Sequence, residues 1–182
     1  MTTLRRGFKT ESNVYSRALR HELQLNECDP LCPWRLAEHL EIPVIPLSGL
    51  LQYEPEGVRY LLGVGRELFS AVTIFVGRYG RMRLIFHNDA HSRARQASNL
   101  AHELAHAILC HPPTPPFVTN QMAESEAKWL GPALLVSNEA ALHIVENSMP
   151  IDSAAASYGV SSQLLQMRLN VSGARIRVAR RK

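Results

Sequence analysis

Apolar side chains recur at helical spacing along much of the chain, and this pattern predicts most of its secondary structure. Two helices are predicted in the N-terminal part, over residues 13–25 and 33–40, and Pro33 is suited to be the first helical residue of the second. A long helix is predicted over residues 92–111, where a run of prolines ends it. Further helices are predicted over residues 120–135, 138–147, 151–158 and 161–170.

The middle of the chain has the pattern of a β-hairpin. Residues 70–76 (SAVTIFV) are rich in β-branched and aromatic side chains, residues 77–80 supply turn chemistry, and residues 81–87 (RMRLIFH) alternate polar with apolar. Residues 42–47 are apolar but contain two prolines, so this segment is predicted to be an edge strand at best. The pattern of residues 57–68 fits either a helix or a loop. This order of elements predicts an α+β fold with the small sheet on one side of the long helix.

The length of the chain fits one domain. Its 182 residues suffice for one sizeable core, and 46% hydrophobic with 20% charged residues is the composition of an ordinary soluble globular protein. We therefore expect a single domain over residues 1–182, in which residues 151–172 form a helical appendage and residues 173–182 a basic tail.

The charge is unevenly distributed, although the formal net charge is only +4. No acidic residue follows Asp152, whereas six basic residues do: Arg168, Arg175, Arg177, Arg180, Arg181 and Lys182. Such a tail suits a nucleic-acid or acidic-protein partner, and it equally suits a solvated terminus. The charge pattern alone does not choose between these interpretations.

Several features favour a cytoplasmic protein. The three cysteines, Cys28, Cys32 and Cys110, are an odd number, which argues against a disulfide framework. Residues 1–20 are charged throughout and lack the apolar core of a secretory signal. No apolar run approaches the ~20 residues that span a membrane.

The candidate chemistry lies in the long helix, in the sequence His102-Glu103-Leu104-Ala105-His106. Residues four apart share one face of a helix, so both imidazoles can reach one metal ion. Both histidines lie at the edge of an apolar arc, so the helix can pack on a core and still present them to a cleft. The H-E-x-x-H spacing therefore predicts a metal site with one open side.

The position of Glu103, directly after the first histidine, predicts that it acts as a general base. Zinc with three protein ligands keeps a water in its fourth position and lowers the pKa of that water to about 7. A nearby carboxylate must take the proton as the water attacks a carbonyl. Glu103 lies too far around the helix to bind the ion beside both histidines, yet close enough to reach the water.

The third ligand is not determined by the spacing. Glu124 and Glu126 flank the apolar face of the next predicted helix on opposite sides, and Cys110 and His111 are also near in sequence. We interpret His111 as a residue that turns away from the histidine face and interacts with the C-terminal end of the helix dipole.

The pattern S-x-L-A-H-E-L-A-H-x-x-L at residues 98–109 resembles the ImmA/IrrE family of metallo-endopeptidases. Glu124-Ser125-Glu126-Ala127, followed by Ala133-Leu134-Leu135, is similar to the family's second motif, E-x-x-A-N-x-F-A-x-x-L-L-M-P. The hairpin ending in Ile85-Phe86-His87-Asn88 and the segment Tyr158-Gly159-Val160-Ser161 also resemble the family, so the likeness covers roughly residues 12–172.

The resemblance implies a compact thermolysin-like zincin core, and one metallopeptidase domain. It implies that Glu124 is the third ligand beside His102 and His106, that Glu103 is the base, and that Glu126 has a surface or supporting role. It further implies a zinc cofactor, although Mn²⁺ or Fe²⁺ could fill the same ligand set. The implied partner is a protein substrate, a helix-turn-helix repressor whose cleavage regulates transcription.

This chain departs from the family's second motif at Lys128, in the stretch Trp129-Leu130-Gly131-Pro132 and at Ser137. Lys128 replaces the Asn, and because lysine cannot accept a hydrogen bond, the groups that orient the ligands must differ. Pro132 lies within the predicted helix, where we expect a kink, and Ser137 replaces the final Pro. None of these changes touches the four candidate site residues.

The last two predicted helices resemble a helix-turn-helix, with Ser161 as N-cap of the second. That helix offers few base-reading side chains, namely Gln163, Gln166 and Arg168, so we favour packing on the catalytic core over DNA binding. Two alternatives to the peptidase stay open: a DNA-binding regulator with a structural or vestigial metal site, and a docking protein of the toxin–antitoxin type. We expect no membrane partner.

Overall fold

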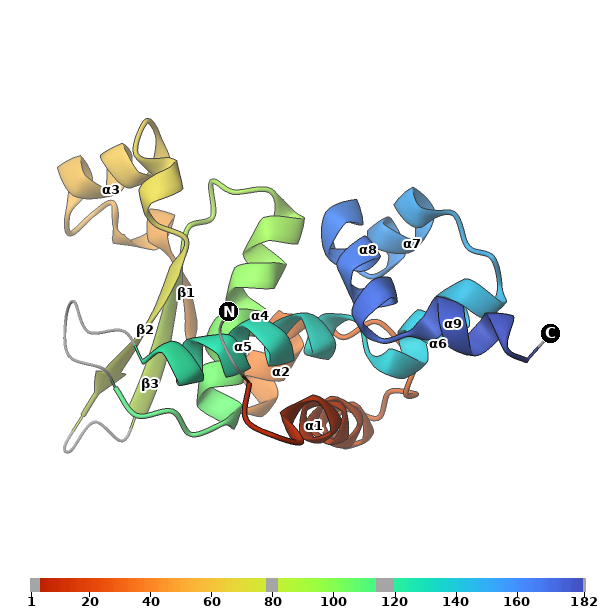
Figure 1. Ribbon diagram of the computed structural model, residues 1–182. Helices are drawn as coiled ribbons and strands as arrows, with labels where there is room; N and C mark the ends of the chain where they lie inside the picture. The colour runs from red at the N-terminus through yellow and green to blue at the C-terminus, as the bar shows by residue number, and fades with distance from the viewer. Residues whose placement is uncertain (1–3, 78–81, 114–119, 182) are drawn as a thin grey trace.

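The computed structural model describes residues 4–77, 82–113 and 120–181, which form an α+β fold (Figure 1). The α-helices within these residues are α1 (Phe8–Glu22), α2 (Pro33–His39), α3 (Pro55–Leu62), α4 (Arg93–Ile108), α5 (Gln121–Leu135), α6 (Asn138–Glu146), α7 (Ile151–Ser157), α8 (Ser162–Val171) and α9 (Ala174–Ala179). The strands are β1 (Val44–Pro46), β2 (Ala71–Val76) and β3 (Met82–His87), and two short 3₁₀ helices are η1 (Leu47–Leu50) and η2 (Arg66–Leu68).

The predicted helices are present, with shifted ends. α1 begins at Phe8, ahead of the predicted residue 13, directly after Gly7 in a left-handed conformation (φ 85°). The ambiguous segment 57–68 contains most of α3 and all of η2. α9 is absent from the prediction, which treats residues 173–182 as a basic tail; Ala174 is fully buried, so packing against the core accompanies this extra helix.

The sheet has the order β1-β3-β2. β2 is antiparallel to β3, with Thr73 opposite Ile85, and β1 is parallel to β3, with Ile45 opposite Phe86. The predicted hairpin and edge strand are therefore confirmed, while most of the predicted turn, residues 78–80, lies outside the described residues. β2 is an edge strand, and within the described part of the chain its second edge is unpaired.

Helices α4 and α5 approach closely at the centre of the molecule, where Gly131 lies. A Cβ atom on Gly131 would lie 3.1 Å from the backbone nitrogen of His102 and 3.2 Å from the carbonyl of Ala101. The core around this contact contains fully buried side chains of α4, α5 and β3: Leu100, Leu104, Leu130, Leu134 and Ile85. This packing fixes α5 against α4 and orders the face of α4 that carries the histidines.

The C-terminal end of α5 is held by two buried arginines. α5 continues through Pro132 to Leu135. Arg20 of α1, fully buried, donates to the carbonyls of Leu134 (2.8 Å) and Leu135 (3.3 Å), and Arg168 of α8 donates to the carbonyl of Val136 (2.9 Å). These bonds satisfy carbonyls that a helix end leaves without an internal donor.

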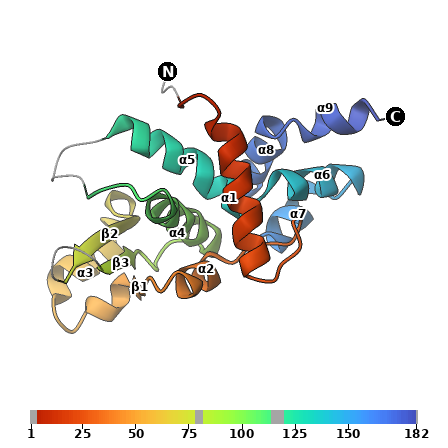
Figure 2. The same cartoon turned by 90° about the horizontal axis from the view of Figure 1, so that it is seen from below.

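The C-terminal helices form a second core cluster with α6. Leu165 and Leu169 of α8 are buried in it, together with Tyr158 and Val160 of the turn after α7. Figure 2 shows α1 between α5 on one side and α6 on the other. The helical pair therefore packs on the rest of the fold, as we favoured from the sequence.

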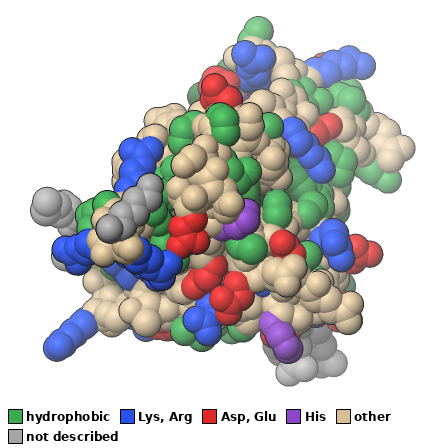
Figure 3. All heavy atoms as spheres, turned by 90° about the vertical axis from the view of Figure 1, so that its right-hand side faces the viewer, with side chains coloured by type: hydrophobic (Ala, Val, Ile, Leu, Met, Phe, Trp, Pro, Cys, Tyr) green, Lys and Arg blue, Asp and Glu red, His purple; other side chains and the backbone are tan. Residues whose placement is uncertain are grey.

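Arg168, proposed above as a base-reading side chain, is 2% exposed and donates to Asn138 as well as to Val136, so it is not available at the surface. On the face that carries these helices, several Lys and Arg side chains lie together at the left edge, and acidic side chains lie nearer the middle (Figure 3). No helix among the described residues has both the length and the apolar character needed to cross a bilayer.

Candidate metal centre

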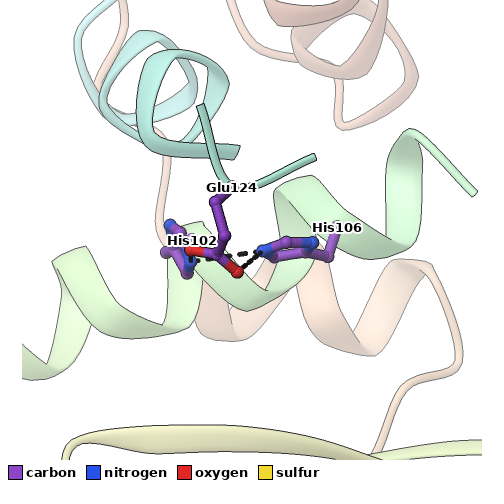
Figure 4. Close-up of side chains that lie close together, drawn as sticks. All are labelled: His102, His106 and Glu124. Atoms are coloured by element: carbon purple, nitrogen blue, oxygen red, sulfur yellow. Dashed lines mark hydrogen bonds and ion pairs between the residues drawn. The ribbon is translucent and has the colours of Figure 1, made fainter. Parts of the chain in front are cut away.

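His102 and His106 lie one turn apart on α4, and both point toward α5 (Figure 4). The opposite face of the helix is buried, and Ser92 caps its start by accepting a hydrogen bond from the backbone of Arg95. The side chains of the two histidines are 25% and 19% exposed. They therefore lie at the boundary between core and solvent, as the apolar arc predicts.

Glu124, in the first turn of α5, completes the group. Its Oε2 lies 3.5 Å from Nε2 of His102 and its Oε1 lies 3.3 Å from Nε2 of His106, while the two Nε2 atoms are 3.2 Å apart. Asn120 caps α5 by accepting a hydrogen bond from the backbone of Ala123. This cap begins the helix one turn before Glu124.

The spacing of these donor atoms fits a tetrahedral divalent ion. Zinc binds imidazole nitrogen and carboxylate oxygen at about 2.0–2.2 Å, so two tetrahedral ligands are separated by about 3.3–3.6 Å. Each pair of side chains approaches to 3.2–3.5 Å, with a different oxygen of Glu124 toward each histidine, and one donor atom from each residue lies within 4.8 Å of the others. The group could therefore hold a metal ion, and two nitrogens with one carboxylate form a donor set of the zinc-peptidase kind.

The electrostatics of the group favour neutral imidazole at His106. Burial, followed by the neighbouring His102, lowers the pKa of His106 to about 4, although Glu124 acts in the opposite direction. A metal ion binds the deprotonated ring nitrogen, so a low pKa keeps this side chain in the ligand form at neutral pH.

The structure shows which of Glu124 and Glu126 faces the two histidines, a choice that the helical periodicity of the sequence could not make. Glu126 lies on the other side of α5, where its Oε1 accepts from Nε of Arg5 (2.6 Å) and its Oε2 lies 3.2 Å from Nε2 of His111. Glu124 alone of the two belongs to the group of potential metal ligands found among the described residues.

Glu103 faces the sheet, beside a cleft. Thr73 of β2 donates a 2.6 Å hydrogen bond from Oγ1 to Oε2 of Glu103. The cleft has a volume of about 530 Å³ and is lined by Val72, Thr73, Ile74, Phe75, Arg83, Glu103, His106, His111, Pro112, Pro113 and Glu124. Strand β2 thus forms one wall, and the carboxylate of Glu103 lies where that wall meets α4.

The interpretation of His111 as turned away from the site is wrong. α4 ends at Ile108, and Cys110 then adopts a left-handed conformation (φ 54°) that turns the chain back along the helix. As a result, Nδ1 of His111 lies 2.9 Å from Nδ1 of His106. Extending helical phase beyond the end of the helix caused the error; a turn signal at Cys110 is not evident in its sequence.

Two further residues border the site without having been assigned a role. Lys128 places Nζ 3.8 Å from Oε2 of Glu124, one turn away on α5, and its side chain is 71% exposed. Arg83 of β3 donates to the carbonyls of His106 (3.4 Å) and His111 (3.5 Å). The i,i+4 spacing to Glu124 could have indicated the first contact.

Comparison with known proteins identifies the family. The family model described as the IrrE N-terminal-like domain matches residues 67–170, from η2 to α8, and so includes both helices of the candidate metal centre. No curated protein matches the chain. The match covers more than half of the chain and includes the potential metal-binding group, so this protein belongs to the Peptidase_M78 family of IrrE N-terminal-like metallopeptidases.

Proposed function

We propose that this protein is a zinc-dependent endopeptidase that hydrolyses a peptide bond in a protein substrate. His102, His106 and Glu124 hold the ion, and Glu103 is the general base. The convergence of two imidazoles and one carboxylate from two different helices, with one donor atom of each within 4.8 Å of the others, is the observation that carries the proposal.

A divalent ion at this position would supply Lewis acidity, which polarises the substrate carbonyl and acidifies water. Glu103 then takes the proton of the attacking water and delivers it to the leaving amine. Thr73 occupies Oε2 of Glu103, and Oε1 receives no hydrogen bond from the described residues, so Oε1 is the oxygen we assign to proton transfer.

The cleft favours an extended peptide as substrate. Its wall is β2, an edge strand whose backbone can form hydrogen bonds with a further strand. A peptide paired with β2 would pass beside Glu103, because Thr73 of that strand touches the carboxylate. We further propose that the protein has a thermolysin-like zincin core, forms one domain over residues 1–182, is located in the cytoplasm, and cleaves a helix-turn-helix repressor.

Elemental analysis of the purified protein tests the metal site. We expect about one zinc per chain in wild type and in His143→Ala, and a loss of zinc in His106→Ala. His143 is the matched control because it lies exposed on α6 and bonds to Asn147. Wild type that takes up no zinc, even when zinc is supplied, would refute the proposal.

Cleavage of a tryptic peptide library, followed by mass spectrometry, tests the reaction. We expect cleavage products with zinc-loaded wild type and none with Glu103→Gln, which should still bind zinc because its amide leaves the three ligands intact. Equal cleavage by both proteins would exclude Glu103 as the base.

A further inference from the structure

A row of polar groups runs behind His106, away from its metal-facing edge. Nδ1 of His106 lies 2.9 Å from Nδ1 of His111, Nε2 of His111 lies 3.2 Å from Oε2 of Glu126, and Oε1 of Glu126 accepts from Nε of Arg5 at 2.6 Å. The row joins the end of α4, the middle of α5 and the segment before α1. It lies largely inside the protein: the side chains of His111 and Glu126 are 12% and 9% exposed.

With metal bound, one assignment of ring protons satisfies every contact in this row. If Nε2 of His106 faces the ion, the ring proton of His106 must be on its Nδ1. This N–H then donates to Nδ1 of His111. Nδ1 of His111 must therefore be unprotonated, so the ring proton is on Nε2 and is donated to Glu126. Glu126 also accepts from Arg5, whose guanidinium fixes the carboxylate.

We propose that His111 is a positioning residue for the metal centre, and that Glu126 determines its tautomer. His111 holds the ring of His106 so that Nε2 points toward His102 and Glu124, and its acceptor nitrogen increases the basicity of the bound imidazole. This inference rests on the proposed function, because it requires His106 to be a metal ligand.

The fold supports this role in two ways. The left-handed turn at Cys110 brings His111 back to His106, and Glu126 lies two residues after Glu124, on the side of α5 that does not face the metal site. Two acidic residues of α5 are thus linked to opposite ends of the His106 ring, Glu124 directly at Nε2 and Glu126 through His111.

Zinc affinity, measured by competition with a chromogenic chelator, tests the proposal. We expect His111→Phe to weaken zinc binding about 10–100-fold, the usual cost of removing a group that orients a metal-bound histidine. His111→Asn should recover most of the affinity, because its amide oxygen can accept at the position of Nδ1. Glu126→Gln should weaken binding less than His111→Phe, and the exposed His143→Phe should not change it.

The ring tautomers give a second readout that does not depend on a variant folding. In zinc-loaded wild type, ¹⁵N NMR of the histidine rings should show a proton on Nδ1 of His106 and on Nε2 of His111. A proton on Nδ1 of His111 would overturn the proposal, whatever the variants do.

The outcomes separate this proposal from the one it rests on. If wild type binds zinc and His111→Phe, folded by circular dichroism, binds it equally tightly, the positioning role fails while the metal site stands. A lower melting temperature with unchanged zinc affinity would likewise mean that His111 only stabilises the fold and does not position the metal ligand. If wild type binds no zinc, the metal site itself fails and the positioning role with it.

Discussion

The hydroxyl of Thr73 donates a 2.6 Å hydrogen bond to the carboxylate of Glu103, which joins the edge strand of the sheet to the helix of the metal centre. The bond holds Oε2 of Glu103 against β2. The position of β2 therefore also determines where Oε1, the other carboxylate oxygen, points. A strand that pairs with substrate would thereby be in direct contact with the proposed base.

Replacing Thr73 with Val should lower kcat without loss of zinc. A hydrogen bond to a charged group contributes about 1.5–3 kcal/mol, so its loss from the reacting arrangement should cost about 10-fold or more in rate. Steady-state cleavage of a peptide identified from the library gives the measurement. Thr73→Ser, which retains the hydroxyl, is the control, and a Val variant as fast as wild type would contradict the role of the bond.

Removal of metal should destabilise the protein. An ion that binds only the folded state at 100 times its dissociation constant adds about 2.7 kcal/mol, so chelation should lower the melting temperature by roughly 5–10 °C for a chain of this size. Differential scanning fluorimetry with and without a chelator measures this shift. His106→Ala should show no shift, and an equal shift in that variant would mean that the metal stabilises another site.

Gly131→Ala should loosen the contact between α4 and α5. The added Cβ would meet backbone atoms of α4 at 3.1–3.2 Å, and backbone cannot give way as a flexible side chain does. Such overpacking costs about 1–3 kcal/mol, and moving α5 outward would also draw Glu124 from the histidines. We expect weaker zinc binding and a lower urea midpoint.

The control for Gly131→Ala is Gly57→Ala on exposed helix α3, where the nearest atom to the new Cβ is 3.5 Å away. That change should be neutral or stabilising, since alanine is the better helix former. Unchanged zinc binding and stability in Gly131→Ala would show that the two helices adjust without cost.

Stability should fall below neutral pH, in part through His87. This side chain is 5% exposed at the end of β3, its Nδ1 has no hydrogen-bond partner within the described residues, and burial lowers its pKa. The unfolded chain, with a histidine pKa of about 6.5, then binds more protons than the folded protein, so the stabilisation present above that pH is lost as the pH falls.

Urea unfolding at pH 7.5 and 5.5 checks this prediction. His87→Phe should lose less stability between the two pH values than wild type does. Other histidines contribute to both proteins, so the difference between them isolates position 87. Equal losses would mean that His87 is protonated in the folded state as readily as in the unfolded chain.

Local sequence patterns predicted the hairpin, most helices and the pairing of His102 with His106, because each depends on spacing within one element. Glu124 and Glu126 could not be separated in this way, since the rotation of α5 relative to α4 depends on the close contact at Gly131. The contact of His111 with His106 could not be predicted, because the position of His111 follows from the left-handed backbone at Cys110. The contact of Thr73 with Glu103 required the placement of a strand beside a helix.

The two buried arginines at the end of α5 indicate which fragments of the chain would keep the hydrogen bonds at that helix end. Arg20 and Arg168 come from opposite ends of the sequence, yet they bind three consecutive carbonyls, of residues 134–136. A fragment limited to the family match, residues 67–170, would lack α1 and with it the hydrogen bonds from Arg20 to the carbonyls of Leu134 and Leu135. We therefore expect a stable fragment to extend beyond the matched region on its N-terminal side, so that it keeps Arg20, and to include α8, which supplies Arg168.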